Sequence, residues 1–284
     1  MIRWTEYSAT LPIMQYGGAG ANHNPWDFDA YDDDGPSQFD QGTLDAFTRY
    51  AVLHIRLFPY FWELAQAART QGLPTVQALG LAYPHLGMHP QDEYLVGSDI
   101  LVAPVEVEGA TSRTVDVPDG RWISWWTHET FAGPQAALLV DAPLGQGPLF
   151  QRVGSAIPML RRSVMTLSPS DGSVDSWADD AGKLNARVYP DETGAGFELG
   201  TGEALEAEAW NGDSMSPRVI HLVAGSLYSG WDLDVYGGAS GVTVDGVDLP
   251  QGEEGCEECW FVVESPWVRV VTSGTDVTIE EASE

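Results

Sequence analysis

A chain of 284 residues with 43% hydrophobic and 19% charged residues can bury one or more cores, which excludes the class of disordered proteins. Its 42 acidic residues against 13 Lys and Arg give a net charge of −29. Such a surface repels nucleic acid and anionic lipid, so we expect neither as a partner. Because no apolar run is long enough to cross a bilayer, we also expect no membrane span.

Residues 1–6 lack the basic region and apolar stretch of a secretion signal. The acidic surface nevertheless favours an extracellular or periplasmic parent protein, with adaptation to a salty habitat as the alternative. Cys256 and Cys259 form a C-x-x-C pair. No second pair completes a zinc site, and the surroundings are not strand-to-helix as in thioredoxins. A local disulfide is favoured, followed by two free thiols.

Residues 1–41 are rich in chain breakers and are predicted to be loop. The acidic run at residues 32–34 precedes Gly35-Pro36. Its spacing does not match the ligand ladder of an EF-hand, so we expect a solvated turn there and no metal.

Residues 43–71 carry apolar side chains at steps of three and four, which predicts a helix. Thr43 is the predicted N-cap, and Gly72 marks the stop. Pro59 lies inside this run and is expected to kink the helix or split it in two. Residues 73–81 then form a short apolar run after a helix, which indicates a parallel strand.

From residue 93 onward, short runs of Val, Ile and aromatic residues alternate with Gly, Pro and Asp turns, a pattern typical of a β-sandwich. The predicted strands there are 100–107, 112–117, 122–126 and 137–141. Residues 168–182 have the composition of a junction. A second β-rich module follows, with predicted strands at 186–189, 204–210, 218–223, 231–236, 261–263 and 268–271.

Several segments occur in an order that is similar to the carboxyl-terminal part of glycoside hydrolase family 31 (its α-glucosidase, α-xylosidase and myogenesis-regulating-glycosidase-like members). They are Arg3-Trp4 with residues 11–14 (Leu-Pro-Ile-Met), residues 56–60 (Arg-Leu-Phe-Pro-Tyr), residues 72–77, residues 82–85, residues 94–105, residues 118–126 and residues 148–158. The match is good over residues 2–160 and weak beyond.

The resemblance implies an α+β, multi-domain chain: the end of a (β/α)₈ TIM barrel followed by β-sandwich domains. The implied boundaries are 1–95 for the last β/α units, 96–168 for a proximal sandwich and 169–284 for a distal β-rich domain. Since a complete barrel takes about 250 residues, residues 1–95 supply only its last one or two units.

In this family two aspartates on middle barrel strands perform retaining hydrolysis, and no motif for either occurs here. The resemblance therefore implies no catalytic residue in this chain, and we expect the chain alone to be inactive. Asp27 and Asp29 lie in the expected active-site loop, but a solvated role is favoured for both. No cofactor and no metal are implied.

The resemblance implies that this chain contributes one wall of the sugar pocket. Gln15, Tyr16, His23 and Trp26 lie where the barrel rim is expected, and sugars bind to polar and aromatic side chains. Gln15 and Gly17 stand where the family usually has Arg and His, which puts ordinary α-glucosidase specificity in question. Packing in a long loop is the alternative for Trp26. For Trp4, Trp62, Trp122, Trp125 and Trp126, core or inter-domain packing is favoured.

The sequence therefore predicts the carboxyl-terminal part of a retaining α-glycosidase, whose partners are an α-glycoside substrate and the missing amino-terminal barrel portion. One alternative is a carbohydrate-binding or structural β-sandwich module without chemistry. A decayed remnant that does not fold stably is the other.

Overall fold

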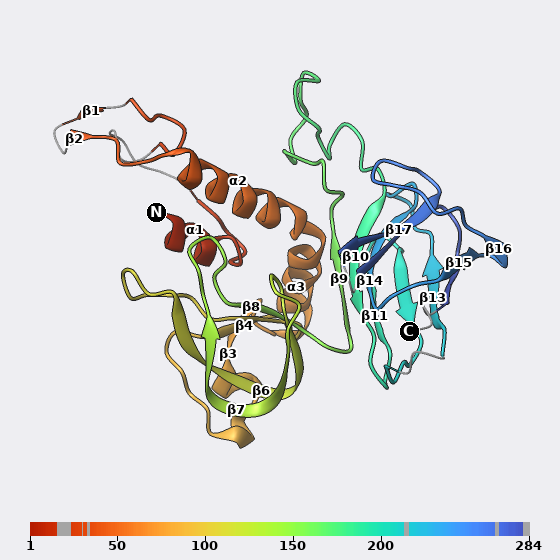
Figure 1. Cartoon of the computed structure of the whole chain (residues 1–284), viewed down its shortest axis with the longest axis horizontal. Coiled ribbons are helices and arrows are strands. Elements are labelled where there is room, and N and C mark those ends of the chain that lie inside the picture. The colour runs from red at the N-terminus through yellow and green to blue at the C-terminus, as the bar shows by residue number, and fades with distance from the viewer. Residues whose placement is uncertain (16–23, 30, 33–34, 213–215, 265–266, 281–284) are drawn as a thin grey trace. The chain divides into compact units, whose positions relative to one another are not determined.

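The computed structural model describes residues 1–15, 24–29, 31–32, 35–212, 216–264 and 267–280. The chain divides into two compact units, each described by itself below. The first unit comprises Met1–His54 and Gln71–Gln151, and the second comprises Ile55–Thr70 and Arg152–Glu284 (Figure 1). The regular structure of the described chain is mostly β-sheet with a few helices, and these residues do not form a closed barrel. Among them, no helix is both long and apolar enough to cross a membrane.

The first unit begins with helix α1 (Ile2–Ser8), the hairpin of β1 (Tyr31–Asp32) and β2 (Gly35–Pro36), and helix α2 (Gln41–Arg56). The prediction of Thr43 as the N-cap of α2 is wrong. The carboxylate of Asp40 accepts hydrogen bonds from the amide and the hydroxyl of Thr43, both at 2.8 Å. Asp40 therefore caps the first turn, and the helix begins earlier than the apolar periodicity indicates.

The predicted split of the long helix at Pro59 is confirmed. Helix α2 ends at Arg56, and α3 (Phe58–Gln71) places Pro59 in its first turn. A proline is tolerated there because the amide it lacks would have no intrahelical partner. Gly72 follows α3 with a φ of 73°, the left-handed conformation that ends helices, as predicted.

The first unit contains a six-stranded sheet with strand order β3-β4-β5-β8-β6-β7. The strands are β3 (Val76–Ala78), β4 (Tyr94–Val96), β5 (Ile100–Val102), β6 (Ser112–Ser124), β7 (Thr130–Asp141) and β8 (Leu149–Arg152). A short helix α4 (Leu79–Ala82) and a 3₁₀ turn η1 (Pro84–Leu86) connect β3 to β4. The two strands pair antiparallel, so the prediction of a parallel strand over residues 73–81 is wrong. The short connection through α4 reverses the chain, which the apolar run does not reveal.

Strands β6 and β7 form one long hairpin. The predicted strand 112–117 lies within β6, and the predicted strand 122–126 overlaps its end at residues 122–124. Register shifts near Val117 and Gly120 bend β6 between them. Trp122 is fully buried in the core of this sheet, together with Leu101 and Phe150. The packing role predicted for Trp122 is therefore confirmed.

The second unit contains two further sheets. One has five strands in the order β17-β18-β14-β10-β9, and the other has six in the order β11-β12-β13-β19-β15-β16. The bounds are β9 (Ser155–Met159), β10 (Leu184–Tyr189), β11 (Ala195–Glu198), β12 (Ala204–Ala207), β13 (Arg218–Val223), β14 (Trp231–Tyr236), β15 (Gly241–Val244), β16 (Val247–Asp248), β17 (Cys259–Glu264), β18 (Trp267–Thr272) and β19 (Asp276–Glu280). All described pairs in this unit are antiparallel except β10 with β14.

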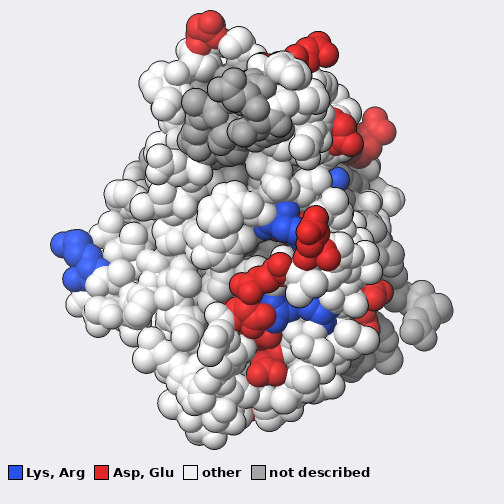
Figure 2. Space-filling view, turned by 90° about the vertical axis from the view of Figure 1, so that its left-hand side faces the viewer, with Lys and Arg blue, Asp and Glu red and all other residues white. Residues whose placement is uncertain are grey.

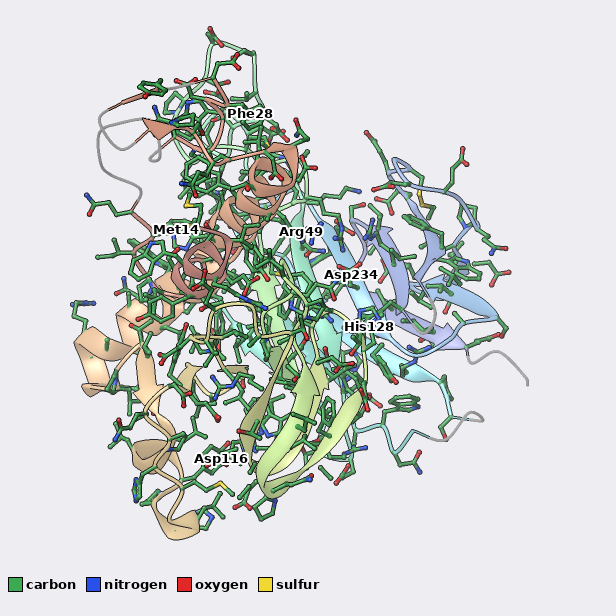
Figure 3. The ribbon with its side chains drawn as sticks, turned by 60° about the vertical axis from the view of Figure 1, so that its left-hand side comes forward. Met14, Phe28, Arg49, Asp116, His128 and Asp234 are labelled. Atoms are coloured by element: carbon green, nitrogen blue, oxygen red, sulfur yellow. A yellow bond between two sulfur atoms is a disulfide. The ribbon has the colours of Figure 1, made fainter. Side chains whose placement is uncertain are left out.

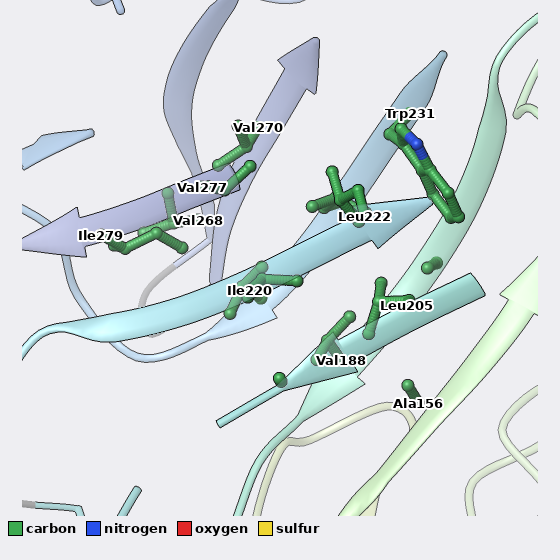
Figure 4. Packing of buried hydrophobic residues seen from close by; sticks show 14 of the residues in the cluster. Ala156, Val188, Leu205, Ile220, Leu222, Trp231, Val268, Val270, Val277 and Ile279 are labelled. Carbon is green, nitrogen blue, oxygen red and sulfur yellow. The ribbon is translucent and has the colours of Figure 1, made fainter. Parts of the chain in front are cut away.

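The two sheets share one apolar core (Figure 4). On β13, Ile220 and Leu222 are buried, whereas His221 between them is exposed. Val268 and Val270 of the other sheet belong to the same cluster. This alternation is that of two sheets packed face to face, so the region is β-rich, as predicted.

The five-stranded sheet also buries charged groups. Asp234 of β14 (Figure 3) forms ion pairs with Arg162 and with Arg269, the latter at 3.0 Å. Burial opposes ionisation of Asp234, but these guanidinium groups outweigh it and hold the pKa of Asp234 below its usual range. Arg56, the last residue of α2, donates to Asn185 at 2.7 Å and to the carbonyl of Leu160 at 3.1 Å. These bonds fix the start of α3 against the sandwich within the second unit.

Residues 168–182 form an irregular segment, with a bridge between Thr166 and Ser176, and they lie inside the second unit. A domain junction there stays a prediction. The boundaries after residues 95 and 168 stay predictions. Cys256 and Cys259 form the local disulfide that the spacing favours. Among the described residues, no other cysteine is present.

Candidate functional site

The segment predicted to line a sugar pocket is described only in part, because Tyr16 and His23 lie outside the described residues. Gln15 is exposed. Trp26 keeps 56% of its surface exposed, and its ring lies edge-on to Phe47 of α2 at 6.2 Å between centroids. Trp26 thus makes a loop-packing contact and still presents much of its ring. The pocket role of these four residues stays a prediction.

A hollow of about 490 Å³ lies beside α1 in the first unit. Three aromatic rings follow one another along it: the centroids of Trp4 and Tyr7 are 5.6 Å apart, and those of Tyr7 and Tyr94 are 5.9 Å apart. Asp92 and Arg3 contribute polar groups to its lining. Trp4 is 60% exposed, so it does not pack in the core of the first unit, and inter-domain packing stays a prediction.

Two charged residues of α1 hold this helix in place. Arg3 donates to the carbonyls of Ala110 at 2.8 Å and Ala142 at 2.6 Å. Glu6, which is buried, pairs with Arg3 at 2.8 Å and accepts the amide of Gly145 at 2.7 Å. A helix of seven residues is not stable by itself in water, so these bonds are what position the aromatic row.

A buried carboxylate lies next to this hollow. Glu93 accepts the amide of Asp116, a residue of β6 (Figure 3), at 3.0 Å and pairs with Arg113 at 2.9 Å. Burial nevertheless disfavours its charged form and raises the pKa of Glu93 to about 7. Glu93 therefore changes its charge in the neutral range.

The second unit contains a separate hollow of about 290 Å³, which we call the α3 hollow. Its apolar lining comes from α3, from the irregular segment and from two turns of the sandwich: Phe58, Trp62, Trp177, Leu199, Leu227 and Tyr228. The ring centroid of Phe58 is 6.1 Å from that of Trp62 and 5.4 Å from that of Trp177. Trp62 is 52% exposed, so it does not pack in the core of the second unit, and inter-domain packing stays a prediction for it too.

Two carboxylates organise the α3 hollow. Glu63 of α3 accepts the amide of Gly200 at 2.9 Å. Glu203, almost fully buried, accepts the amides of Leu227 at 2.9 Å and Tyr228 at 3.2 Å. Burial opposes the charge of Glu203, but the bonds to Thr201, Leu227 and Tyr228 outweigh it and lower the pKa of Glu203. Both turns that line the hollow are thus fixed by side-chain hydrogen bonds.

In the part of the chain that the structure describes, no group of three or more His, Cys, Asp or Glu side chains is arranged to hold a metal ion. Asp27 and Asp29 are exposed in their loop. Asp33 and Asp34 lie outside the described residues.

Residues 72–157 match the model of the glycosyl hydrolase family 31 C-terminal domain. The chain carries the carboxyl-terminal region of family 31. The matched residues span the connection from Gly72 through the six-stranded sheet and end within β9. The family resemblance of the motifs in residues 2–160 is thereby confirmed.

Among its relatives, a sulfoquinovosidase of Escherichia coli K12 is 32% identical over 170 residues, which are 59% of this chain and 23% of that protein. Alpha-glucosidase 2 of Bacillus thermoamyloliquefaciens is 26% identical over 238 residues, which are 82% of this chain and 29% of that protein. The chain thus corresponds to about a quarter of the length of these family 31 proteins.

Solved structures show the same fold. A cycloalternan-forming enzyme of Listeria monocytogenes, in complex with a pentasaccharide substrate, superposes with a TM-score of 0.78 at 20% identity, over 98% of this chain and 27% of that one. A family 31 dextranase of Flavobacterium johnsoniae gives a TM-score of 0.74 at 22% identity, over 99% of this chain and 37% of that one. Both superpositions include the residues beyond 160, where the family motifs of the sequence are weak.

Sequence patterns did not indicate the α3 hollow. Phe58 and Trp62 stand four residues apart on a helix, which is equally the spacing of a packing face. Trp177 and Tyr228 come from segments more than a hundred residues further along the chain. Only the folded sandwich brings these rings together.

Proposed function

We propose that this chain is the carboxyl-terminal part of a retaining α-glycosidase of family 31, and that an amino-terminal part supplies both catalytic carboxylates. The observation that carries the proposal is the family match over residues 72–157 in a chain that spans about a quarter of its relatives. Retaining hydrolysis needs two carboxyl groups about 5–5.5 Å apart, one as nucleophile and one as acid. The substrate would be an O-linked α-glycoside.

In this proposal residues 1–95 contribute the last β/α units of the barrel, residues 96–168 the proximal sandwich and residues 169–284 the distal domain. Gln15, Tyr16, His23 and Trp26 would form one wall of the sugar pocket at the barrel rim. The exposed ring of Trp26 supports a contact with the apolar face of a sugar. Trp4, exposed on α1, is available to pack against the amino-terminal part.

The test is an activity assay of the purified chain on aryl α-glucosides and α-xylosides. We expect no turnover by the chain alone, and turnover once the amino-terminal part is added in a separate polypeptide. The matched control is a mixture in which the expected nucleophile of that part is replaced by alanine. Turnover by the chain alone that survives repeated purification would contradict the proposal that an amino-terminal part supplies both catalytic carboxylates.

A second candidate is a sugar-binding sandwich without chemistry. The α3 hollow favours it, because aromatic rings and a carboxylate meet there on a rigid frame. Retardation of the chain in gels containing soluble α-glucans, together with no gain of activity on adding the amino-terminal part, would favour this candidate over the first.

A further inference from the structure

We propose that the α3 hollow in the second unit is a carbohydrate-binding site, which takes one end of a neutral α-glucan. The choice of an α-glucan rests on the proposed function. The site itself rests on three properties of the hollow: its aromatic walls, a carboxylate at its edge, and the rigid turns that line it.

The aromatic walls suit the apolar face of a sugar ring. Phe58 lies 6.1 Å from Trp62 and 5.4 Å from Trp177 between centroids, and the planes are inclined by 41° and 60°. The rings therefore do not stack on one another and leave faces available. Trp62 is 52% exposed, so its indole offers a platform at the mouth. The volume of about 290 Å³ is at the lower end of the range for ligand pockets, which suits a short saccharide.

The edge of the hollow carries an acceptor for sugar hydroxyls. Glu63 lines it, and its Oε1 accepts the amide of Gly200 at 2.9 Å. Among the described residues, Oε2 of Glu63 has no hydrogen-bond partner. An aliphatic ligand would desolvate this carboxylate without compensation, whereas a sugar hydroxyl can donate to it. The net charge of −29 disfavours an anionic ligand.

The hollow is also held open by its own hydrogen bonds. Glu203 bonds the amides of Leu227 and Tyr228 and the hydroxyl of Thr201, so that the two lining turns share one buried carboxylate. Ser226 adds a bond from its amide to the carbonyl of Thr201 at 3.3 Å. A preformed pocket loses little conformational entropy on binding. This small cost matters for a sugar, because its contacts give only a small favourable free energy of binding.

The experiment titrates the purified chain with maltotriose and isomaltotriose and measures binding by calorimetry and saturation-transfer NMR. We expect binding in the millimolar range, and a loss of about tenfold in Trp62→Ala. Trp4→Ala, which removes an exposed indole of the first unit, is the matched control and should bind as the original chain does. Melting curves of all variants check that each remains folded.

Glu63→Gln separates a sugar from a cationic peptide as the occupant. The amide oxygen keeps the bond to Gly200, and the other atom still meets a sugar hydroxyl, so we expect a loss of only a few-fold for the trisaccharides. Absence of binding by the original chain, or loss in Trp4→Ala but not in Trp62→Ala, would overturn the proposal. Binding of an oligolysine peptide that Glu63→Gln abolishes, without trisaccharide binding, would also overturn it. Because no step depends on catalysis, these outcomes are separate from the activity assay.

Discussion

A buried carboxylate in each unit has a shifted pKa, and the two shifts have opposite directions because the surroundings differ. Glu203 receives hydrogen bonds from two amides and a hydroxyl, and these lower its pKa despite burial. Glu93 has an amide and Arg113 as partners, and here burial dominates and raises the pKa to about 7. The balance between burial, the donors that face each carboxylate and, for Glu93, the nearby charges of Asp92 and Asp116 therefore sets the direction of each pKa shift.

The raised pKa of Glu93 predicts a pH dependence of stability. Its pKa is 4.5 in the unfolded chain and about 7 in the folded one, so the folded state binds the proton more tightly. Proton binding by Glu93 therefore adds about 3 kcal/mol to the free energy of unfolding, and this contribution is complete below pH 4.5. It is lost as the pH rises through about 7. In Glu93→Gln this loss should disappear, so the variant gains stability relative to the original chain between pH 5 and 8.

Urea unfolding at pH 5, 6.5 and 8 measures this difference. Asp92→Asn is the matched control, because Asp92 also pairs with Arg113 but is much more exposed. That variant should keep most of this pH dependence, because burial is the largest cause of the raised pKa of Glu93 and the charge of Asp92 contributes least. Parallel stability curves for Glu93→Gln and the original chain across this range would contradict the prediction.

At the scale of elements, α1 is held by bonds to distant parts of the chain. It has no side-chain cap, and Arg3 and Glu6 reach loops around Ala110, Ala142 and Gly145. In Glu6→Ala the amide of Gly145 and the guanidinium of Arg3 lose a charged partner in a buried setting. We expect a cost of about 2–3 kcal/mol in the free energy of unfolding, together with local detachment of α1.

Hydrogen exchange measures the detachment directly. The amide of Ala9, bonded to the carbonyl of Thr5 at 3.1 Å, should lose protection more than amides of β10 do. Arg69→Ala is the control, since Arg69 is exposed and its side chain bonds to Gln66 of its own helix. An equal loss of protection in Glu6→Ala and Arg69→Ala would show that the contacts of Glu6 do not hold α1.

Sequence patterns predict the bounds of some strands and the helix break, but they do not predict every strand or its direction. Strands β13 and β14 have the bounds that alternation predicts, and the helix break follows from Pro59 alone. Strands β11 and β19 were missed, because residues 195–198 and 276–280 mix small and acidic residues with few apolar ones. Strand direction was wrong for β3, since pairing depends on the connection and not on the apolar run. The α3 hollow depends on contacts between residues far apart, which no local pattern contains.

At the scale of the whole molecule, the charge counts predict the composition of the surface but not the placement of the cations. Most Lys and Arg groups on the face shown in Figure 2 lie next to Asp or Glu groups. Others are used internally: Arg269 is 5% exposed and pairs with Asp234. Of the 13 basic residues, several therefore neutralise buried or neighbouring carboxylates and do little to reduce the excess of 29 negative charges elsewhere.

This excess predicts that the folded chain is destabilised by self-repulsion at low ionic strength. Salt shortens the Debye length from about 30 Å at 0.01 M to about 10 Å at 0.1 M, which screens repulsion between exposed carboxylates but affects the buried Arg269–Asp234 pair much less. Stability should therefore rise with NaCl. A gain of 1 kcal/mol corresponds to about 2–4 °C in Tm for a domain of 150–250 residues.

Scanning calorimetry in 10 mM buffer with 0, 0.1 and 0.5 M NaCl measures the effect, and we expect Tm to rise by at least about 2 °C. A parallel scan in 0.5 M sucrose is the comparison, because sucrose is excluded from the protein surface but carries no charge and does not screen carboxylates. Any gain in Tm from sucrose should therefore not depend on the net charge of the variant. A charge-reducing variant, Glu108→Gln, changes an exposed side chain and should itself raise Tm slightly in low salt and not in high salt. A Tm that falls with NaCl would mean that exposed ion pairs, not repulsion, dominate the electrostatics of this chain.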